Sequence, residues 1–222
     1  GPLALRYEDG ALRGIHLGGR EVVRRIYAAV RDHNWGTVLP TLSDVRIERT
    51  AETFRIGFLA EHREGPIDFA WRGAISGDAA GTITFAMEGE SRGTFLRNRI
   101  GFCVLHPPEP CAGAPCVVEH ASGGRTEGTF PRFISPAQPF VDMRAIAHEF
   151  APGLWAEVAF AGDIFEMEDQ RNWTDDSYKT YCTPLHLPFP VAVTPGTRVA
   201  QAVTLRLRGA VPASGAASGA PL

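Results

Sequence analysis

The densest chemistry in this sequence lies in residues 166–181. This run gathers carboxylates, a guanidinium, an ammonium, amides, an indole and two phenols directly after an apolar segment. Ordinary turns and loops are instead dominated by Gly, Pro, Asn, Asp and Ser. Side chains of the kinds found here can close around the hydroxyls of a sugar ring or hold the surface of another protein domain.

Two acidic residues in this run are expected to lie side by side. Alternation over residues 164–168 predicts a strand that places Glu166 and Glu168 on one face. Because neighbouring carboxylates raise one pKa unless a cation intervenes, we expect Arg171 and Lys179 beside them. One reading is a site with a glutamate as general base and a cation that stabilises an oxyanion. The other is a structural salt-bridge cluster on a solvated sheet face.

A second dense motif spans residues 95–107. If strand pairing starts near Arg99, then Arg97 and Arg99 share a face with Gly101, whereas Asn98 points to the other side. The two arginines could hold a carboxylate or sugar hydroxyls through paired donors. Equally, they could pair with the acidic strand inside the sheet.

Several single residues could serve either a binding site or the structure alone. Trp35 could stack on a sugar face or cap the core, and Asp32 could make a local side-chain turn. His106 ends a strand, where a hydrogen-bonding loop role is favoured over that of a general base. The catalytic candidates are therefore Glu166, Glu168 and Arg171. The candidates for substrate binding or interdomain contact are Arg97, Asn98, Arg99, His106, Asp169, Asn172, Trp173, Lys179 and Trp35.

Composition narrows the function classes. The chain has 222 residues, 44% hydrophobic and 21% charged, with net charge −3, so a nucleic-acid partner is not expected. Without an apolar run of roughly 20 residues or a signal-peptide pattern, we expect no membrane partner and a cytoplasmic location. The four cysteines are expected to be free thiols. No metal-ligand spacing or cofactor motif is found, so the site is expected to hold neither metal nor cofactor.

The strand pattern predicts an all-β fold. Segments of alternating character between Gly, Asp and Pro turns favour a large antiparallel β-sandwich over residues 1–208, of which the supersandwich of galactose-mutarotase-like proteins is one form. Residues 209–222, rich in Ala, Gly, Ser and Pro, are predicted to be a linker or disordered tail, which suggests a truncated chain. Strands are expected at residues 3–7, 11–17, 21–30, 45–49, 54–61, 67–76, 81–90, 99–106, 116–120, 140–150, 155–160, 164–168 and 199–208.

Three motifs together, residues 31–37, 98–107 and 168–181, resemble the N-terminal region of the bacterial D-apionate lactonase family. The resemblance covers residues 1–208, and residues 168–181 are its most specific part. It implies a β-rich N-terminal domain that precedes a TIM-like barrel in a longer polypeptide. It also implies hydrolysis of D-apionolactone to D-apionate during apiose breakdown.

Three functions follow from these observations. The leading one is the N-terminal β domain of a sugar-lactone hydrolase, whose partners are the sugar lactone and the barrel of the same polypeptide. Barrel active sites lie at the C-terminal ends of the barrel strands, so the isolated chain is expected to be inactive. The alternatives are a carbohydrate-binding or mutarotase-like sandwich without hydrolytic activity, and a structural interdomain module.

Overall fold

Alternation of apolar and polar residues makes this chain a stack of antiparallel strands. In β7 (Ile67–Gly77), for example, Ile67, Phe69 and Trp71 are buried while Arg72 is exposed. A strand with this pattern must cover one face with another layer, because isolated sheets leave their apolar side in water. The computed structural model describes residues 1–173 and 176–209.

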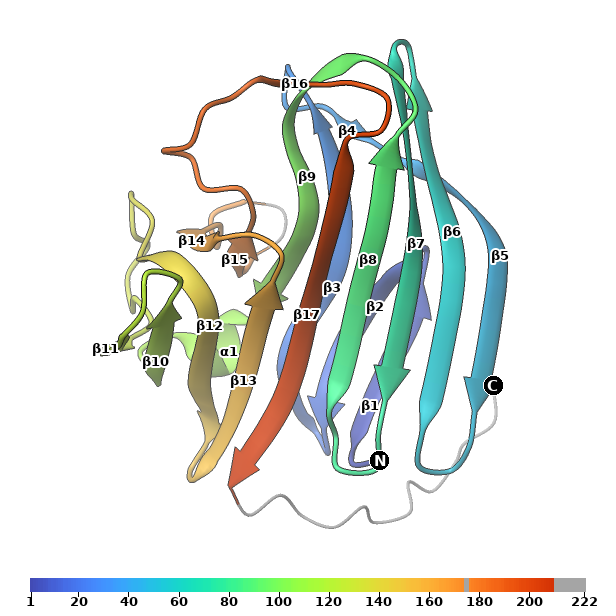
Figure 1. The fold of residues 1–222 in the computed structure, drawn as a ribbon. Helices are drawn as coiled ribbons and strands as arrows, with labels where there is room; N and C mark the ends of the chain where they lie inside the picture. Colours follow the sequence, from blue (N-terminus) through green and yellow to red (C-terminus); the bar gives the residue numbers. More distant parts are fainter. Residues whose placement is uncertain (174–175, 210–222) are drawn as a thin grey trace.

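The first layer is a broad antiparallel sheet, whose central strands lie in front in Figure 1. Its strands, in the order in which they pair, are β5 (Pro40–Arg49), β6 (Phe54–Glu64), β7, β8 (Ile83–Ser91), β17 (Arg198–Gly209), β13 (Leu154–Ala161), β12 (Phe140–Ala151), β10 (Pro115–His120) and β11 (Arg125–Thr129).

The second layer packs behind the first. Its strands pair in the order β1 (Leu3–Glu8), β2 (Ala11–Leu17), β3 (Arg20–Asp32), β9 (Phe95–His106), β15 (Tyr178–Tyr181) and β14 (Phe165–Asp169). Two short strands flank it, β4 (Thr37–Val38) beside β3 and β16 (Val191–Val193) beside β9. Because β14 also pairs with the start of β12, the two layers join along one edge.

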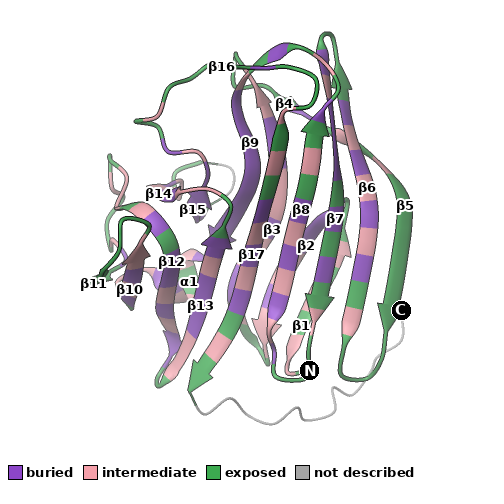
Figure 2. Ribbon diagram, viewed as in Figure 1, coloured by how far each residue is buried: buried purple, intermediate pink, exposed green. Residues whose placement is uncertain are grey.

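One apolar core fills the space between the layers. Phe85 of β8 and Phe102 of β9 meet across it with ring centroids 4.8 Å apart, and both are fully buried. Figure 2 shows the resulting alternation of buried positions with intermediate or exposed ones along β6 and β8. Full burial of a large apolar side chain contributes about 1.5–3 kcal/mol, so this cluster supplies the main stabilisation of the sandwich.

The fold class predicted from the sequence is confirmed, and every predicted strand is present, most of them with shifted ends. Four strands were missed: β4, β11, β15 and β16. β1 and β2, the first two predicted strands, form a hairpin around Asp9 and Gly10, and both of these residues have positive φ. Within the described residues the sole helix, α1 (Pro108–Cys111), is far too short to cross a membrane.

The predictions for the cysteines and for the tail have different outcomes. Cys103, Cys111, Cys116 and Cys182 are all buried and free, as predicted. The predicted linker lies, from residue 210 onward, outside the described residues.

A glutamine of the first layer reaches across to the backbone of the second. The Gln201 side chain of β17 points inward, and its Oε1 accepts a hydrogen bond from the Phe102 amide at 3.0 Å. Cys182 Sγ donates to the same oxygen at 3.3 Å. Gln201 and Cys182 approach the backbone of β9 at Gly101, which has a φ of 150°. A Cβ there would meet both Cys182 Sγ and Gln201 Oε1 at 2.3 Å, so only glycine fits.

We therefore predict that Gly101→Ala lowers the free energy of unfolding by about 1–3 kcal/mol, the usual cost of overpacking a filled site. Urea denaturation followed by tryptophan fluorescence measures it. Gly57→Ala is the matched control, because it also replaces a strand glycine but its Cβ would meet nothing nearer than 4.0 Å. Equal effects of the two changes would contradict the close approach at Gly101.

Candidate functional site

A pocket of about 430 Å³ opens on the outer face of the second layer, where β3, β9 and β15 lie side by side. It brings together residues from four separate segments of the chain, 29–35, 99–103, 168–173 and 179–185. Its lining comprises Ala29, Arg31, Trp35, Arg99, Gly101, Cys103, Glu168, Gln170, Trp173, Lys179, Tyr181, Cys182 and Leu185.

Strand alternation explains why these side chains meet. Along β9, Arg99 and Gly101 line the pocket, whereas Ile100 and Phe102 belong to the core. Of the three residues predicted to share a face, Arg99 and Gly101 line the pocket and Arg97 does not. Along β15, Lys179 and Tyr181 face the same pocket.

Arg99 lies in an aromatic enclosure and is 6% exposed. Its guanidinium carbon lies 4.9 Å from the Trp35 ring centroid, 5.4 Å from that of Tyr181 and 5.7 Å from that of Phe189. Cation–π contact of this kind stabilises a desolvated guanidinium by roughly 2 kcal/mol. Burial lowers the pKa of Arg99, while Tyr181 and Glu166 favour its charged form.

Trp35 is held in place by the turn that precedes it. Asp32 Oδ1 accepts hydrogen bonds from the amides of Asn34, at 2.8 Å, and Gly36, at 2.7 Å. This is the side-chain turn expected from the sequence. Trp35 has a φ of 67° and packs edge-on against Phe189 with ring centroids 5.2 Å apart. The turn thus projects the indole over the Arg99 guanidinium.

The two glutamates that were predicted to lie side by side have different environments, because Glu168 lines the pocket and Glu166 is buried. Glu168 lines the pocket, accepts a hydrogen bond from Gln170 at 2.6 Å and pairs with Lys179 Nζ at 3.5 Å. Glu166 is 2% exposed and accepts hydrogen bonds from the Tyr181 hydroxyl and the Leu185 amide, both at 2.6 Å. Lys179 is therefore the cation that accompanies the acidic strand.

Arg171 has a different partner from the one expected. Its Nε and Nη2 donate to the two oxygens of Asp169 at 2.9 and 2.7 Å, and its guanidinium carbon lies 4.5 Å from the Tyr178 ring centroid. Burial opposes ionisation of Asp169, but hydrogen bonds from Arg171 and Ser135 lower its pKa. Neither Arg171 nor Asp169 lines the pocket, and their pairing fixes the start of the loop.

Three other predicted site residues also lie away from the pocket lining. His106 is fully buried, contacts Thr180 Oγ1 at 3.0 Å and packs against His148. Burial holds the pKa of His106 well below its usual value, which favours a neutral core residue. Arg97 and Asn98 precede the pocket on β9 and do not line it, and Asn98 is 2% exposed.

The rim of the pocket carries the exposed part of the loop. Trp173 is 69% exposed and lines the opening. Asn172 beside it is exposed and does not line the pocket. Residues 174 and 175, which belong to the same predicted motif, lie outside the described residues.

Sequence reasoning did not select Tyr181, Arg31 or Gln170 as site residues. A usable signal was present for the first of these. Residues 178–181 have the aromatic and β-branched composition of a strand, and period two would have placed Tyr181 beside Lys179. Arg31 lay within a predicted motif, but the pairing of β3 with β9 that brings it to Arg99 depends on tertiary structure.

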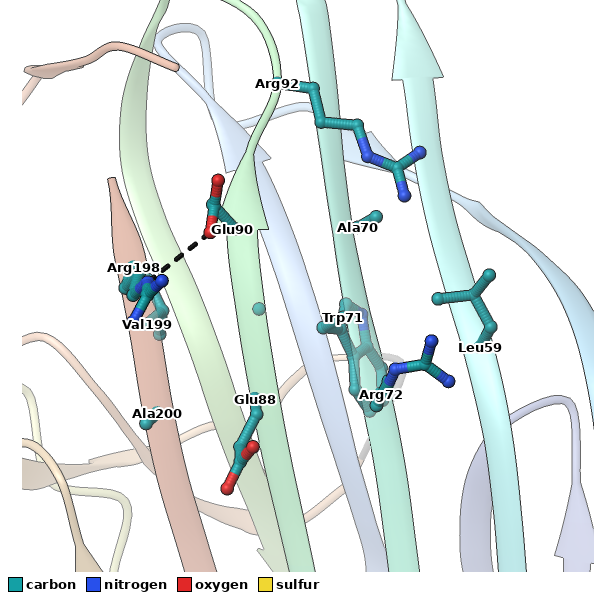
Figure 3. A pocket seen from close by; sticks show the side chains of 11 residues that line it. Leu59, Ala70, Trp71, Arg72, Glu88, Glu90, Arg92, Arg198, Val199 and Ala200 are labelled. Carbon is teal, nitrogen blue, oxygen red and sulfur yellow. Dashed lines mark hydrogen bonds and ion pairs between the residues drawn. The ribbon is translucent and has the colours of Figure 1, made fainter. Parts of the chain in front are cut away.

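A larger but shallower hollow lies on the outer face of the first layer (Figure 3). It has a volume of about 620 Å³, and its charged groups include Glu90 and Arg198, which pair with each other at 3.4 Å. Arg92 likewise pairs with Glu61 outside the hollow. The Arg99 pocket is the stronger candidate, because two of its charged residues, Arg99 and Lys179, are buried and its charged groups line one space. Across the described residues, no group of three or more His, Cys, Asp or Glu is placed to hold a metal ion.

Comparison with known proteins identifies the family. The profile described as D-apionate lactonase, N-terminal domain, matches residues 1–210. The chain belongs to this family. A D-apionate lactonase from Brucella anthropi is 44% identical over 199 residues, which cover 87% of this chain and 32% of that protein. The chain thus spans about a third of the length of this curated relative.

Solved structures show that the family has the fold of aldose epimerases. An Escherichia coli K12 protein assigned provisionally as an aldose 1-epimerase superposes with a TM-score of 0.59 at 12% identity, covering 95% of this chain and 97% of its own. A galactose 1-epimerase from Lactobacillus acidophilus gives 0.53 at 8% identity, covering 93% and 95%. This likeness confirms the mutarotase-like sandwich and shows the fold alone.

The pairing of Tyr181 with Glu166 should be measurable as a coupling energy. We predict that Tyr181→Phe and Glu166→Gln each lower stability, and that the double variant loses about 1.5–3 kcal/mol less than their sum, the contribution of a hydrogen bond to a buried charge. Chemical denaturation of the four proteins gives this value. Strict additivity would contradict the interaction.

Proposed function

We propose that this chain is the N-terminal β domain of a sugar-lactone hydrolase that opens D-apionolactone to D-apionate, and that its Arg99 pocket contacts the lactone. The remainder of the polypeptide, a TIM-like barrel, completes the active site. We place the protein in the cytoplasm, a reducing compartment that suits four free buried cysteines.

The observation that supports this proposal most is the convergence of Arg99, Glu168 and Trp173 on one pocket in a domain of the lactonase family. A lactone offers a carbonyl oxygen, ring hydroxyls and apolar ring faces. The pocket offers cationic donors, a carboxylate acceptor and the aromatic walls of Trp35, Trp173 and Tyr181. Sites that bind small polar ligands combine these features.

Each pocket residue has a chemical task in this proposal. Glu168 accepts a proton from the attacking water, whose oxygen bonds to the lactone carbonyl carbon. Arg99 and Lys179 stabilise the negative charge that develops on the carbonyl oxygen. The bond from the carbonyl carbon to the ring oxygen then breaks, and the ring oxygen takes up the proton held by Glu168. The second proton of the water is released when the new carboxylic acid ionises, so a free carboxylate and a hydroxyl remain.

Residues outside the pocket support its frame. The carboxylate of Glu166 accepts from Tyr181 and from the Leu185 amide, and thereby fixes two lining residues. The pair of Arg171 with Asp169 anchors the loop that carries Trp173. In this proposal both are positioning groups.

The fold shared with aldose epimerases favours a second candidate, sugar recognition without turnover. In that case the Glu168 carboxylate, held by Lys179 and Gln170, would only accept hydrogen bonds from sugar hydroxyls. Activity of variants in the full-length enzyme separates the two functions.

We predict that Glu168→Gln in a full-length enzyme that carries the barrel lowers the rate of D-apionolactone hydrolysis by about a hundredfold or more, because a general base is lost. Arg171→Ala should instead lower thermal stability while activity per folded molecule survives. The isolated 222-residue chain should show little or no turnover. Proton release on ring opening measures the turnover of all three proteins, and thermal denaturation measures the stability of Arg171→Ala.

Glu127→Gln, an exposed change on β11, is the control and should leave both properties unchanged. Full activity of the Glu168→Gln enzyme would remove the base from this domain and favour recognition without turnover. Complete turnover by residues 1–222 would show that the sandwich alone contains the active site.

A further inference from the structure

One donor in the pocket is left without a partner. Nη2 of Arg99 is buried and has no hydrogen-bond partner among the described residues. Its neighbour Nη1 reaches only the Asn98 carbonyl, at 3.4 Å. A buried donor without a partner costs about 1–3 kcal/mol, more when it is charged. A ligand with oxygen acceptors would remove this cost.

The charge of the pocket favours an anion as that ligand. Arg31, Arg99 and Lys179 line it together with a single carboxylate, that of Glu168. The carboxylate of Glu166 lies behind Tyr181, where it already accepts two hydrogen bonds. The pocket is therefore cationic in a chain with a formal net charge of −3.

The partners of the cations indicate that the anion is a carboxylate bound by Arg99. Lys179 is already paired with Glu168 at 3.5 Å, whereas no carboxylate lies within 4.0 Å of Arg99 among the described residues. A planar guanidinium binds a carboxylate through two parallel N–H donors. Trp35, Tyr181 and Trp173 form aromatic walls of the pocket, against which the C–H groups of a sugar chain can pack.

We infer that this pocket is a sugar-acid subsite, which binds the carboxylate of an aldonate on Arg99 in preference to a neutral sugar. The inference rests on the proposed function and deepens it. The carbonyl oxygen of a bound lactone carries only a partial charge, whereas ring opening leaves a full carboxylate at the same place. The pocket therefore holds the product more tightly than the substrate, and the whole enzyme is inhibited by its product.

Calorimetric titration of the 222-residue chain with sodium D-apionate, sodium D-gluconate, neutral D-apiose and sodium acetate tests this. We expect D-apionate to bind at least about tenfold more tightly than D-apiose, a difference of about 1.4 kcal/mol. Gluconate should also bind, since the class of ligand is a sugar acid. Acetate should bind weakly, since it lacks hydroxyls for Glu168 and a chain for the aromatic walls.

Arg99→Met removes the charge and keeps an unbranched stem, so it should abolish the preference for D-apionate over D-apiose. Trp173→Ala should weaken both sugars alike. Arg125→Met, a change of the same kind at an exposed position on β11, is the matched control and should alter neither affinity. Circular dichroism checks that each variant is folded.

Equal affinity of the wild-type chain for D-apionate and D-apiose would overturn the inference, as would an unchanged preference in Arg99→Met. If Arg99→Met does not fold, the affinities of the wild-type chain for D-apionate and D-apiose still test the inference. Binding of D-apionate by a protein whose full-length form lacks lactonase activity would refute the proposed function alone. Lactonase activity without anion preference would refute the subsite alone.

Discussion

The contact between Gln201 and the backbone of β9 determines where the second layer can lie and hence where the pocket forms. Gln201 reaches from one layer to the Phe102 amide of the other, at the point where Gly101 admits it. Phe102 lies in the core, whereas Arg99, Gly101 and Cys103 of the same strand line the pocket. A side chain at position 101 would separate the layers and displace the strand that carries Arg99.

Burial of charge is the second constraint on the site. A guanidinium that is removed from water must be compensated, and Arg99 receives this from three aromatic rings and from the more distant carboxylates of Glu166 and Glu168. None of these supplies a direct ion pair. Arg99 is therefore held in place while its Nη2 has no hydrogen-bond partner among the described residues. Arg171, which donates two hydrogen bonds to Asp169, stabilises the structure instead.

Local patterning allowed much of the fold to be predicted, because a period of two is a property of the segment itself. It placed strands at residues 3–7, 11–17, 67–76 and 164–168, where β1, β2, β7 and β14 are found. It could not show that Lys179, rather than Arg171, accompanies the glutamates, since that depends on the pairing of β14 with β15. The burial of His106 beside His148 likewise depends on contact between strands far apart in sequence.

The central claim is that the domain binds its sugar ligand in the pocket between β3, β9 and β15. A crystal structure of the chain grown with sodium D-apionate tests it most directly. The account predicts density in this pocket, with the carboxylate within hydrogen-bond distance of Arg99 and the hydroxyls facing Glu168. Density on the outer face of β7 and β8, with the Arg99 pocket filled only by water, would contradict it.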